Sequence, residues 1–479
     1  MNKEWKRAFY THLKKAFPHQ PTQGQLEAFK QLTLFFAEPR ADLVFLLRGY
    51  AGTGKTSLIQ ALVPSLEAFQ KKAVLLAPTG RAAKVMSLYS GRAAFTIHKY
   101  VYRLQTDGRG FSIFRLRPNK ARDTVFIIDE ASMINDDRSD WSGSVLADLL
   151  EFVNSGVRCQ LLLVGDTAQL PPVGSDESPA LNGDYLARLY GLENYGVELK
   201  EVMRQEQESQ LLANATFLRN LQIEPLFDQP QFKLGPDVLR LQEGFEVEDA
   251  LNQAISEVGK EEMCIIVRSN KRANLYNQQL RRRVLWQEDE ISTGDYLMVV
   301  KNNYHWLPDG HKASFIANGD ILELLEIYQL IELYGKRFAR VKLRFTDYVD
   351  AEPFESIILL DVLDHPGASL SWEEQRAFAD EVALDYQDLP TKAAIMKELK
   401  ENPYLNALQV KFAYAITGHK AQGGQWKRVF VEHPWRPEEE ITLDYLRWLY
   451  TAITRAREEV YLLGFPDQYF AQASEPDWE

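Results

Sequence analysis

Short apolar runs, each followed by a polar turn, recur along the first 170 residues of the chain. Four of these runs are nearly continuous, at residues 43–47, 73–77, 124–128 and 160–164. Runs of this length without alternation are typical of parallel strands that are buried on both faces. Ahead of the first run the apolar spacing is helical, at Leu26, Phe29, Leu32 and Phe36. The pattern predicts an α/β fold built on a parallel sheet.

The pattern changes in the second half of the chain. Apolar runs at 265–267 and 296–300 continue the α/β pattern in a second lobe. After residue 320 come β-type runs with little glycine and then a polar helical stretch, at 321–331, 337–345, 355–363 and 371–400. We therefore predict three parts. These are a first lobe at 1–200, a second lobe at 201–320 and 396–479, and an inserted β-rich module at 321–395.

A β-hairpin is predicted inside the first lobe. Two β-type runs, 100–104 and 111–116, flank a polar turn that contains two glycines. This arrangement predicts a hairpin at about 100–118. The segment is too short to own a hydrophobic core, so we expect it to project from the lobe.

Composition and charge narrow the possible partners. The 479 residues carry a formal net charge of −12, so any nucleic-acid contact must come from a local groove. Cys159 and Cys264 lie in separate apolar runs without metal-ligand spacing, and we expect neither a disulfide nor structural zinc. We see no secretory signal and no apolar run of roughly eighteen residues, and therefore expect a cytoplasmic protein without membrane contact.

The turn after the first apolar run carries the strongest chemical signal. Residues 49–56 read GYAGTGKT, match G-x-x-x-x-G-K-[ST], and lie between a predicted strand and a predicted helix. Glycines let the backbone curl so that its N–H groups point at phosphate oxygens. We expect the loop to bind the phosphates of a nucleotide, with Lys55 on the β- and γ-phosphates and Thr56 holding Mg²⁺. The predicted nucleotide contacts are Gly49, Gly52, Thr53, Gly54, Lys55 and Thr56.

Two acidic residues end the third apolar run. Asp129 is placed to bind Mg²⁺, and Glu130 to orient or deprotonate the attacking water. The fourth run leads to Gln169, which we expect to sense the γ-phosphate. Gln25 has two interpretations, either the capping box of a helix that begins after Thr22 or a contact to the adenine edge. Beside a phosphate-binding loop we favour the adenine contact.

Residues after the second apolar run are candidates for nucleic-acid contacts. Thr79 follows that run directly, at the predicted carboxyl edge of the sheet, where open α/β sheets bind ligands. His98 and Tyr100 follow in the segment FTIHKY, which offers a hydroxyl, an imidazole and an aromatic ring. For His98 a purely structural role is an equal alternative.

Several segments together resemble the motifs of a known family. The first half of the chain contains, in order, GYAGTGKT, APTGRAAK, IDEASM and GDTAQLPPV. These segments resemble the motifs of superfamily 1 DNA helicases, and their residues are similar to those of the RecD/Dda branch. Three later segments extend the resemblance, LKEVMRQ at 199–205, YAITGHKAQG at 414–423 and LYTAITRAR at 449–457. The resemblance spans nearly the whole chain.

The resemblance implies a fold and a set of roles. Two RecA-like lobes would close on ATP, and the inserted β-rich module would be an SH3-like barrel. Arg204 and Arg455 would reach the γ-phosphate from the second lobe. Single-stranded DNA would lie across both lobes and travel from 5′ to 3′. Its expected contacts on the second lobe are Thr417 and His419.

The resemblance also implies that the hairpin separates the strands at a duplex junction. Phe111 or Phe114 near its tip could wedge against a base pair, although packing between the two strands is the commoner role of such rings. We expect single-stranded DNA and duplex junctions as partners of a chain able to act as a monomer. One position departs from many relatives, because Gln425 stands where they carry a glutamate that can touch the ribose.

Two other functions stay open at this point. An RNA helicase or translocase on the same scaffold is the first, since contacts to the sugar-phosphate backbone do not by themselves distinguish DNA from RNA. A nucleotide-switched binding subunit without unwinding activity is the second. The acids Asp129 and Glu130, together with two arginines, argue against a mere switch.

Overall fold

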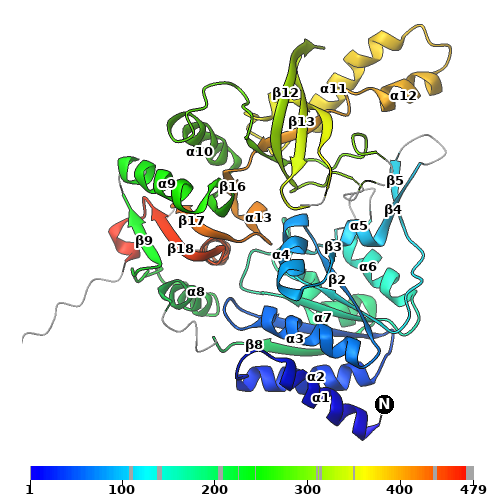
Figure 1. The fold of residues 1–479 in the computed structure, drawn as a ribbon, viewed down its shortest axis with the longest axis vertical. Helices are drawn as coiled ribbons and strands as arrows, with labels where there is room; N and C mark the ends of the chain where they lie inside the picture. Colours follow the sequence, from blue (N-terminus) through cyan, green and yellow to red (C-terminus); the bar gives the residue numbers. More distant parts are fainter. Residues whose placement is uncertain are drawn as a thin grey trace, which may run out of the picture.

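The structure is a computed structural model that describes residues 2–106, 112–137, 143–202, 209–224, 226–242, 244–308, 311, 315–348, 351–434 and 440–470. Within these residues the chain forms two parallel sheets, a closed barrel and a separate two-stranded hairpin (Figure 1). The predicted α/β fold is confirmed. None of the described helices combines the length and the apolar character needed to cross a membrane.

Six strands form the sheet of the first lobe. They are β1 (Leu43–Gly49), β2 (Lys72–Ala77), β3 (Ala94–Thr96), β6 (Thr124–Ile128), β7 (Gln160–Gly165) and β8 (Glu193–Leu199). All neighbours are parallel, in the order β3-β2-β6-β7-β1-β8. The four apolar runs of the sequence are therefore the four central strands of this sheet.

Helices cover both faces of the first sheet, which explains why its strands do not alternate between apolar and polar residues. On β1, Phe45 and Leu47 pack in one apolar cluster, whereas Val44 and Leu46 pack in another on the opposite face. The helices of this lobe are α1 (Lys3–Ala16), α2 (Gln23–Ala37), α3 (Lys55–Ala68), α4 (Gly80–Ser90), α5 (Ile97–Val101), α6 (Val145–Asn154) and α7 (Gly183–Tyr190).

The second lobe has a smaller parallel sheet. Its strands are β9 (Val238–Leu241), β10 (Met263–Val267), β16 (Ala415–Thr417), β17 (Trp426–Glu432) and β18 (Ala456–Leu463). They lie in the order β16-β10-β17-β18-β9. The helices are α8 (Gln210–Leu221), α9 (Gly244–Val258), α10 (Asn270–Arg283), α13 (Gly418–Ala421) and α14 (Leu443–Ile453).

Most helices begin at a Ser, Thr or Asn whose side chain accepts a hydrogen bond from a backbone N–H of the first turn. These N-caps are Asn2, Thr22, Thr79, Thr96, Ser144, Asn182, Ser209, Ser269, Ser371, Thr391 and Thr442. Helix α3 differs, because its N-cap is Gly54, which has no side chain to cap the helix. The N–H groups at the start of α3 are thus left for another acceptor.

The inserted module is a closed five-stranded barrel. Its strands are β11 (Tyr296–Val299), β12 (Ile321–Leu333), β13 (Lys336–Phe345), β14 (Phe354–Leu359) and β15 (Leu408–Phe412). The assignment of the apolar run 296–300 to the second lobe was wrong, because β11 pairs antiparallel with β12 and β15. The polar helical stretch becomes α11 (Trp372–Ala383) and α12 (Lys392–Glu401).

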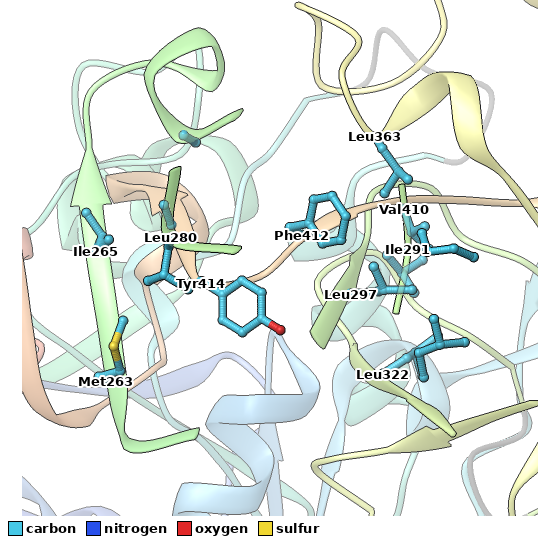
Figure 2. Close-up of a cluster of buried hydrophobic side chains, with 14 of the residues drawn as sticks. Met263, Ile265, Leu280, Ile291, Leu297, Leu322, Leu363, Val410, Phe412 and Tyr414 are labelled. Carbon is cyan, nitrogen blue, oxygen red and sulfur yellow. The ribbon is translucent and has the colours of Figure 1, made fainter. Parts of the chain in front are cut away.

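The barrel and the second lobe share one apolar core, which joins Ile265 on β10 to Leu297 and Phe412 in the barrel. Figure 2 shows Tyr414 between these two groups of side chains. Its hydroxyl donates to Asp295 at 3.1 Å, and Asp295 forms a buried ion pair with Arg281. The barrel is thus held on the second lobe by both apolar and polar contacts.

The predicted hairpin is present as β4 (Tyr102–Thr106) and β5 (Ser112–Leu116), paired antiparallel with Tyr102 opposite Leu116. It stands apart from the six-stranded sheet and projects from the first lobe (Figure 1). Phe114 lies on β5 opposite Leu104. The predicted wedge residue Phe111 lies outside the described residues.

Candidate nucleotide site between the lobes

A cavity of about 560 Å³ lies where the two lobes meet. The first lobe contributes the loop residues around Lys55, the acids Asp129 and Glu130, and Gln169. The second lobe contributes Gly423, Gln425 and residues 454–458. The structure therefore gathers into one cavity motifs that are separated by about 400 residues of sequence.

The loop after β1 (residues 49–54, the phosphate loop) has the backbone conformation expected of a phosphate-binding site. Gly52 and Gly54 have φ values of 71° and 80°, a left-handed conformation that glycine adopts without steric cost. At Gly49 a Cβ atom would lie 2.9 Å from Thr53 Oγ1, so a larger residue does not fit there. Lys55 Nζ donates to the carbonyl oxygens of Gly49 and Tyr50 at 2.7 and 2.9 Å. The ammonium group thus lies directly over the loop that would hold the phosphates.

The Gln25 side chain supports this loop by a hydrogen bond to its backbone. The capping box with Thr22 is present, and Gln25 Nε2 also donates to the carbonyl oxygen of Thr53 at 3.0 Å. The side chain is fully buried and is not among the residues that line the cavity. Gln25 therefore supports the loop, and its adenine contact stays a prediction.

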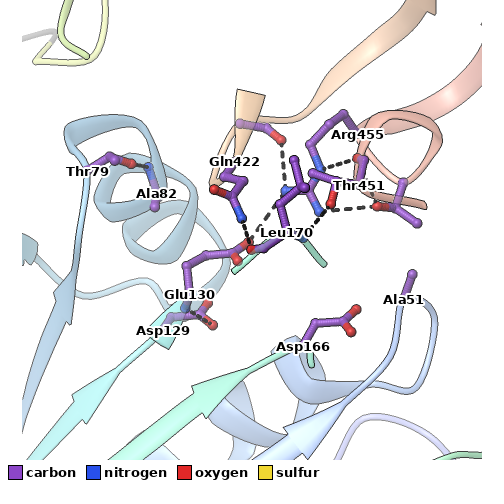
Figure 3. Close-up of polar contacts among 12 residues, drawn as sticks. Ala51, Thr79, Ala82, Asp129, Glu130, Asp166, Leu170, Gln422, Thr451 and Arg455 are labelled. Carbon is purple, nitrogen blue, oxygen red and sulfur yellow. Dashed lines mark hydrogen bonds and ion pairs between the residues drawn. The ribbon is translucent and has the colours of Figure 1, made fainter. Parts of the chain in front are cut away.

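The two acids directly follow β6 (Figure 3), and both line the cavity. Asp129 accepts hydrogen bonds from the Tyr89 hydroxyl at 2.7 Å and from the Glu130 N–H at 2.9 Å. Burial, together with the neighbouring Glu130 charge, raises the pKa of the Asp129 carboxyl. Glu130 has a φ of 51°, a strained conformation for a residue with a side chain, and such strain is concentrated at functional sites.

Arg455 brings the second lobe to these acids. Its Nη1 lies 3.6 Å from Glu130 Oε1, and its guanidinium also donates to the carbonyl oxygens of Thr451 and Gly424. The side chain is only 4% exposed. Packing and hydrogen bonds hold the guanidinium toward the cavity, which preorganises it for a developing negative charge.

A tyrosine of the second lobe bridges two parts of the first. The Tyr450 hydroxyl donates to Asp166 Oδ2 at 2.7 Å and accepts a hydrogen bond from the Ala51 N–H at 2.9 Å. Asp166 follows β7 at the same edge of the sheet as Asp129, and burial raises the pKa of its carboxyl. One hydroxyl group therefore ties α14 to both the phosphate loop and the end of β7.

The segment after β7 is attached to the second lobe at the next residues. The Leu170 N–H donates to Thr451 Oγ1 at 2.9 Å, and Gln422 Nε2 donates to the Leu170 carbonyl oxygen at 2.6 Å (Figure 3). The neighbouring Gln169 lines the cavity, and its buried Oε1 has no hydrogen-bond partner among the described residues. This unpaired acceptor is available to a ligand or to water in the cavity.

The lobes also meet at the predicted nucleic-acid residue Thr79. Its hydroxyl caps α4 by accepting from the Ala82 N–H. Gly423 has a φ of 71°, and a Cβ atom there would lie 3.1 Å from Thr79 Oγ1. The Arg81 guanidinium stacks 3.9 Å from the centre of the Trp426 ring. Two segments of the helicase resemblance are therefore in direct contact across the lobes.

The other predicted nucleic-acid residues have different surroundings. His98 is half-buried beside the Tyr102 ring, and His419 is half-buried on α13. Burial lowers the pKa of both imidazoles, so each is held neutral near pH 7. Tyr100 packs edge-on against Phe126 and Phe152. Tyr100 is half-buried against the core of the first lobe, and its nucleic-acid contact stays a prediction.

Thr417 precedes α13 without capping it, unlike the other threonines at helix starts. Arg204, the second predicted arginine, lies outside the described residues.

Sequence reasoning missed Asp166, Tyr450 and Tyr89. Asp166 could have been found by the rule that identified Asp129, since both directly follow a buried parallel strand. Tyr450 lies inside the segment LYTAITRAR, but nothing in its spacing indicates a bridge to the other lobe. Tyr89 is one of many helix residues, and only the tertiary fold places its hydroxyl on Asp129.

The donor set of the cavity fits Mg²⁺ bound together with a nucleotide. Thr56 and Asp129 both line the cavity and offer hydroxyl and carboxylate oxygens, the kind of ligand that Mg²⁺ prefers. In the described part of the chain, no group of three or more His, Cys, Asp or Glu side chains is placed to hold a metal ion alone. Remaining ligands would be phosphate oxygens and water, and the bound ion would neutralise phosphate charge.

Two known families match the chain, one in its first half and one near its C-terminal end. The AAA domain family matches residues 20–224, and the UvrD-like helicase C-terminal domain family matches residues 412–463. These two segments carry the residues that line opposite sides of the cavity.

Individual proteins are similar to this chain over parts of different length. The ATP-dependent DNA helicase Dda of Enterobacteria phage T4 is 23% identical over 465 residues, which cover 92% of this chain and 98% of Dda. The ATP-dependent RecD2 DNA helicase of Deinococcus radiodurans is 38% identical over 127 residues, which cover 26% of this chain and 16% of RecD2.

A crystal structure of Pif1 helicase from Bacteroides, in complex with ADP-AlF3 and single-stranded DNA, has a TM-score of 0.47 and 14% identity. That match covers 93% of this chain and 94% of the Pif1 chain.

The predicted motifs, the two matched domains and the full-length similarity to Dda agree with one another. Over nearly its whole length the chain is therefore similar to superfamily 1 helicases of the RecD/Dda type.

Proposed function

We propose that this chain is an ATP-driven DNA helicase that moves along single-stranded DNA, from 5′ to 3′. One observation carries the proposal, namely that Arg455 of the second lobe lies 3.6 Å from Glu130 of the first, across a cavity lined by the phosphate loop. An arginine donated across a cleft stabilises charge on a transferring phosphoryl group only while the lobes are together. ATP turnover would therefore be coupled to closing and opening of the lobes.

The predicted residues of the nucleotide site have proposed roles. Lys55 and the glycines of residues 49–54 hold the phosphates, and Thr56 and Asp129 hold Mg²⁺. Glu130 orients or deprotonates the attacking water, while Gln169 senses the γ-phosphate. Arg455, with Arg204, stabilises the charge that develops as the phosphate leaves.

Single-stranded DNA is the proposed track. Thr79 and His98 on the first lobe, and Thr417 and His419 on the second, would grip the strand alternately as the lobes move. DNA is favoured over RNA because two relatives are named as ATP-dependent DNA helicases. The hairpin formed by β4 and β5 is the proposed strand-separating pin.

A strand-displacement assay tests substrate and direction together. Duplexes of DNA and of RNA, each with either a 5′ or a 3′ single-stranded tail, are mixed with ATP and Mg²⁺. We expect opening of the 5′-tailed DNA duplex, and no opening by the matched Lys55→Ala variant. Preferred opening of RNA would establish an RNA helicase. ATP binding without opening of any duplex would favour a nucleotide-switched binding subunit.

A further inference from the structure

A second polar cavity, of about 430 Å³, lies beside the nucleotide cavity. The two cavities share Asp166 and Gln169 as lining residues. Arg48 lines the second cavity from the end of β1, directly before the phosphate loop, and Arg447 lines it from α14 of the second lobe. Both lobes therefore contribute an arginine to a space next to the predicted γ-phosphate sensor.

Several buried polar atoms of this cavity have no hydrogen-bond partner among the described residues. They are Arg48 Nε, Arg447 Nε, Ser132 Oγ and Gln169 Oε1. The Ser132 and Gln169 side chains are 1% and 6% exposed. Buried polar groups are normally satisfied, so four unsatisfied atoms around one cavity indicate a site for a polar ligand.

The two arginines favour an oxyanion as that ligand. Within the described part of the chain the Nε atoms of both arginines have no hydrogen-bond partner, and Arg447 Nη1 donates to the carbonyl oxygen of Asp176. Burial lowers the pKa of the Arg447 guanidinium, because nearby charges do not fully compensate the loss of water. The planar fork of arginine matches the oxygens of phosphate.

The size and charge of the site favour a small anion that binds only transiently. The N-terminal end of α7 also faces the cavity, at Gly183 and Asp184. However, Asp166, Glu177 and Asp184 line the cavity as well. These carboxylates weaken retention of an anion and oppose a polyanionic DNA strand.

We propose that this second cavity is a subsite for inorganic phosphate, which receives the product as it leaves the nucleotide cavity past Gln169. The inference rests on the proposed function, because ATP hydrolysis supplies the phosphate. Arg48 and Arg447 bind the product oxyanion from opposite lobes, and opening of the lobes separates the two arginines and releases it.

Inhibition of ATP hydrolysis by added inorganic phosphate tests the subsite. Because the subsite lies outside the nucleotide cavity, phosphate should inhibit without competing with ATP. In Arg48→Gln and Arg447→Gln the inhibition constant for phosphate should rise at least about fivefold, since each variant loses charge-assisted hydrogen bonds. The chemical cleavage step, measured by rapid quench, should be unchanged. Arg188→Gln is the matched control, because Arg188 is exposed on α7 away from the cavity lining.

Other outcomes would overturn the proposal. Purely competitive inhibition of the wild-type protein by phosphate would overturn it without any variant. An inhibition constant for phosphate that is unchanged in both variants would also overturn it. If the variants bind single-stranded DNA more weakly and keep the wild-type inhibition constant for phosphate, the two arginines bind DNA. Should Arg447→Gln fail to fold, Arg447→Lys, which keeps the charge but loses the fork, replaces it.

Failure of the proposed function can be recognised separately. A wild-type protein that hydrolyses no ATP contradicts the proposed function. The subsite is then tested with the ADP-bound protein, in which phosphate should raise the unfolding temperature of the wild type but not of Arg48→Gln. Equal shifts for the two proteins would refute the subsite.

Discussion

Replacing Tyr450 with phenylalanine tests whether one hydroxyl couples the lobes. The substitution keeps the ring, which is 1% exposed, and removes only the oxygen that bridges Ala51 and Asp166. Both partners lie in the first lobe, whereas Tyr450 belongs to the second. The loss should therefore weaken lobe closure more than it weakens either lobe.

The magnitude follows from the two hydrogen bonds. A hydrogen bond to a charged group contributes ~1.5–3 kcal/mol, and one between neutral groups contributes ~0.5–1.5 kcal/mol. The lower ends apply, because burial raises the pKa of Asp166 and because Ala51 lines the cavity, where water can replace the hydroxyl. The sum is about 2 kcal/mol, which corresponds to a shift of about 30-fold in the closing equilibrium.

The assay is ATP turnover with saturating single-stranded DNA, from which kcat/KM for ATP is obtained. We expect kcat/KM of Tyr450→Phe to fall by up to about 30-fold. Tyr445→Phe is the control, since Tyr445 lies on the same helix and its hydroxyl donates to Tyr469 within the second lobe. A value for Tyr450→Phe within about twofold of wild type, or an equal loss in the control, would refute the coupling role.

Four further predictions address the remaining parts of the molecule. Glu130→Gln should lower turnover about 100-fold or more yet leave ATP affinity nearly unchanged, because the carboxylate acts on water; single-turnover hydrolysis and equilibrium binding check this. Arg455→Lys should slow DNA-stimulated turnover, since lysine lacks the planar fork, and unchanged turnover would contradict the two-lobe mechanism. Deletion of residues 107–114 should abolish unwinding but spare the ATPase, because opening a base-pair step costs ~1.4 kcal/mol and needs an obstacle. Equal loss of both activities would make the hairpin structural. Burial raises the pKa of Asp320 from 3.8 to about 7, so its contribution to stability is present below about pH 4 and is lost as the pH rises through about 7. The unfolding temperature of the wild type should accordingly fall more from about pH 5 to about pH 8 than that of Asp320→Asn.

The central strands and the phosphate loop were readable from local sequence. Buried parallel strands need continuous apolar runs, and a phosphate cradle needs glycines at fixed positions before a helix. Both signals lie within about ten residues, so no knowledge of distant partners is required. The hairpin was predictable for the same reason, because its two strands are neighbours in sequence.

Local sequence was insufficient where a residue's role depends on distant neighbours. The run 296–300 has the composition of a strand in either sheet, and only its pairing with β12 and β15 places it in the barrel. Likewise, only the fold brings the Gln25 side chain to the Thr53 carbonyl oxygen and the Tyr100 ring against Phe126.

The sequence by itself determined the central strands of the first sheet, the position of the phosphate loop and the place of Asp129 and Glu130 after a strand, since each depends on local periodicity and backbone preference. Only the tertiary structure decided that Arg455 faces Glu130, that Tyr450 bridges Ala51 and Asp166, and that Arg48 and Arg447 share a cavity. The physical reason is that these contacts join residues roughly 280–400 positions apart. Such pairs are brought together by burial of apolar faces between elements, which no short stretch of sequence encodes.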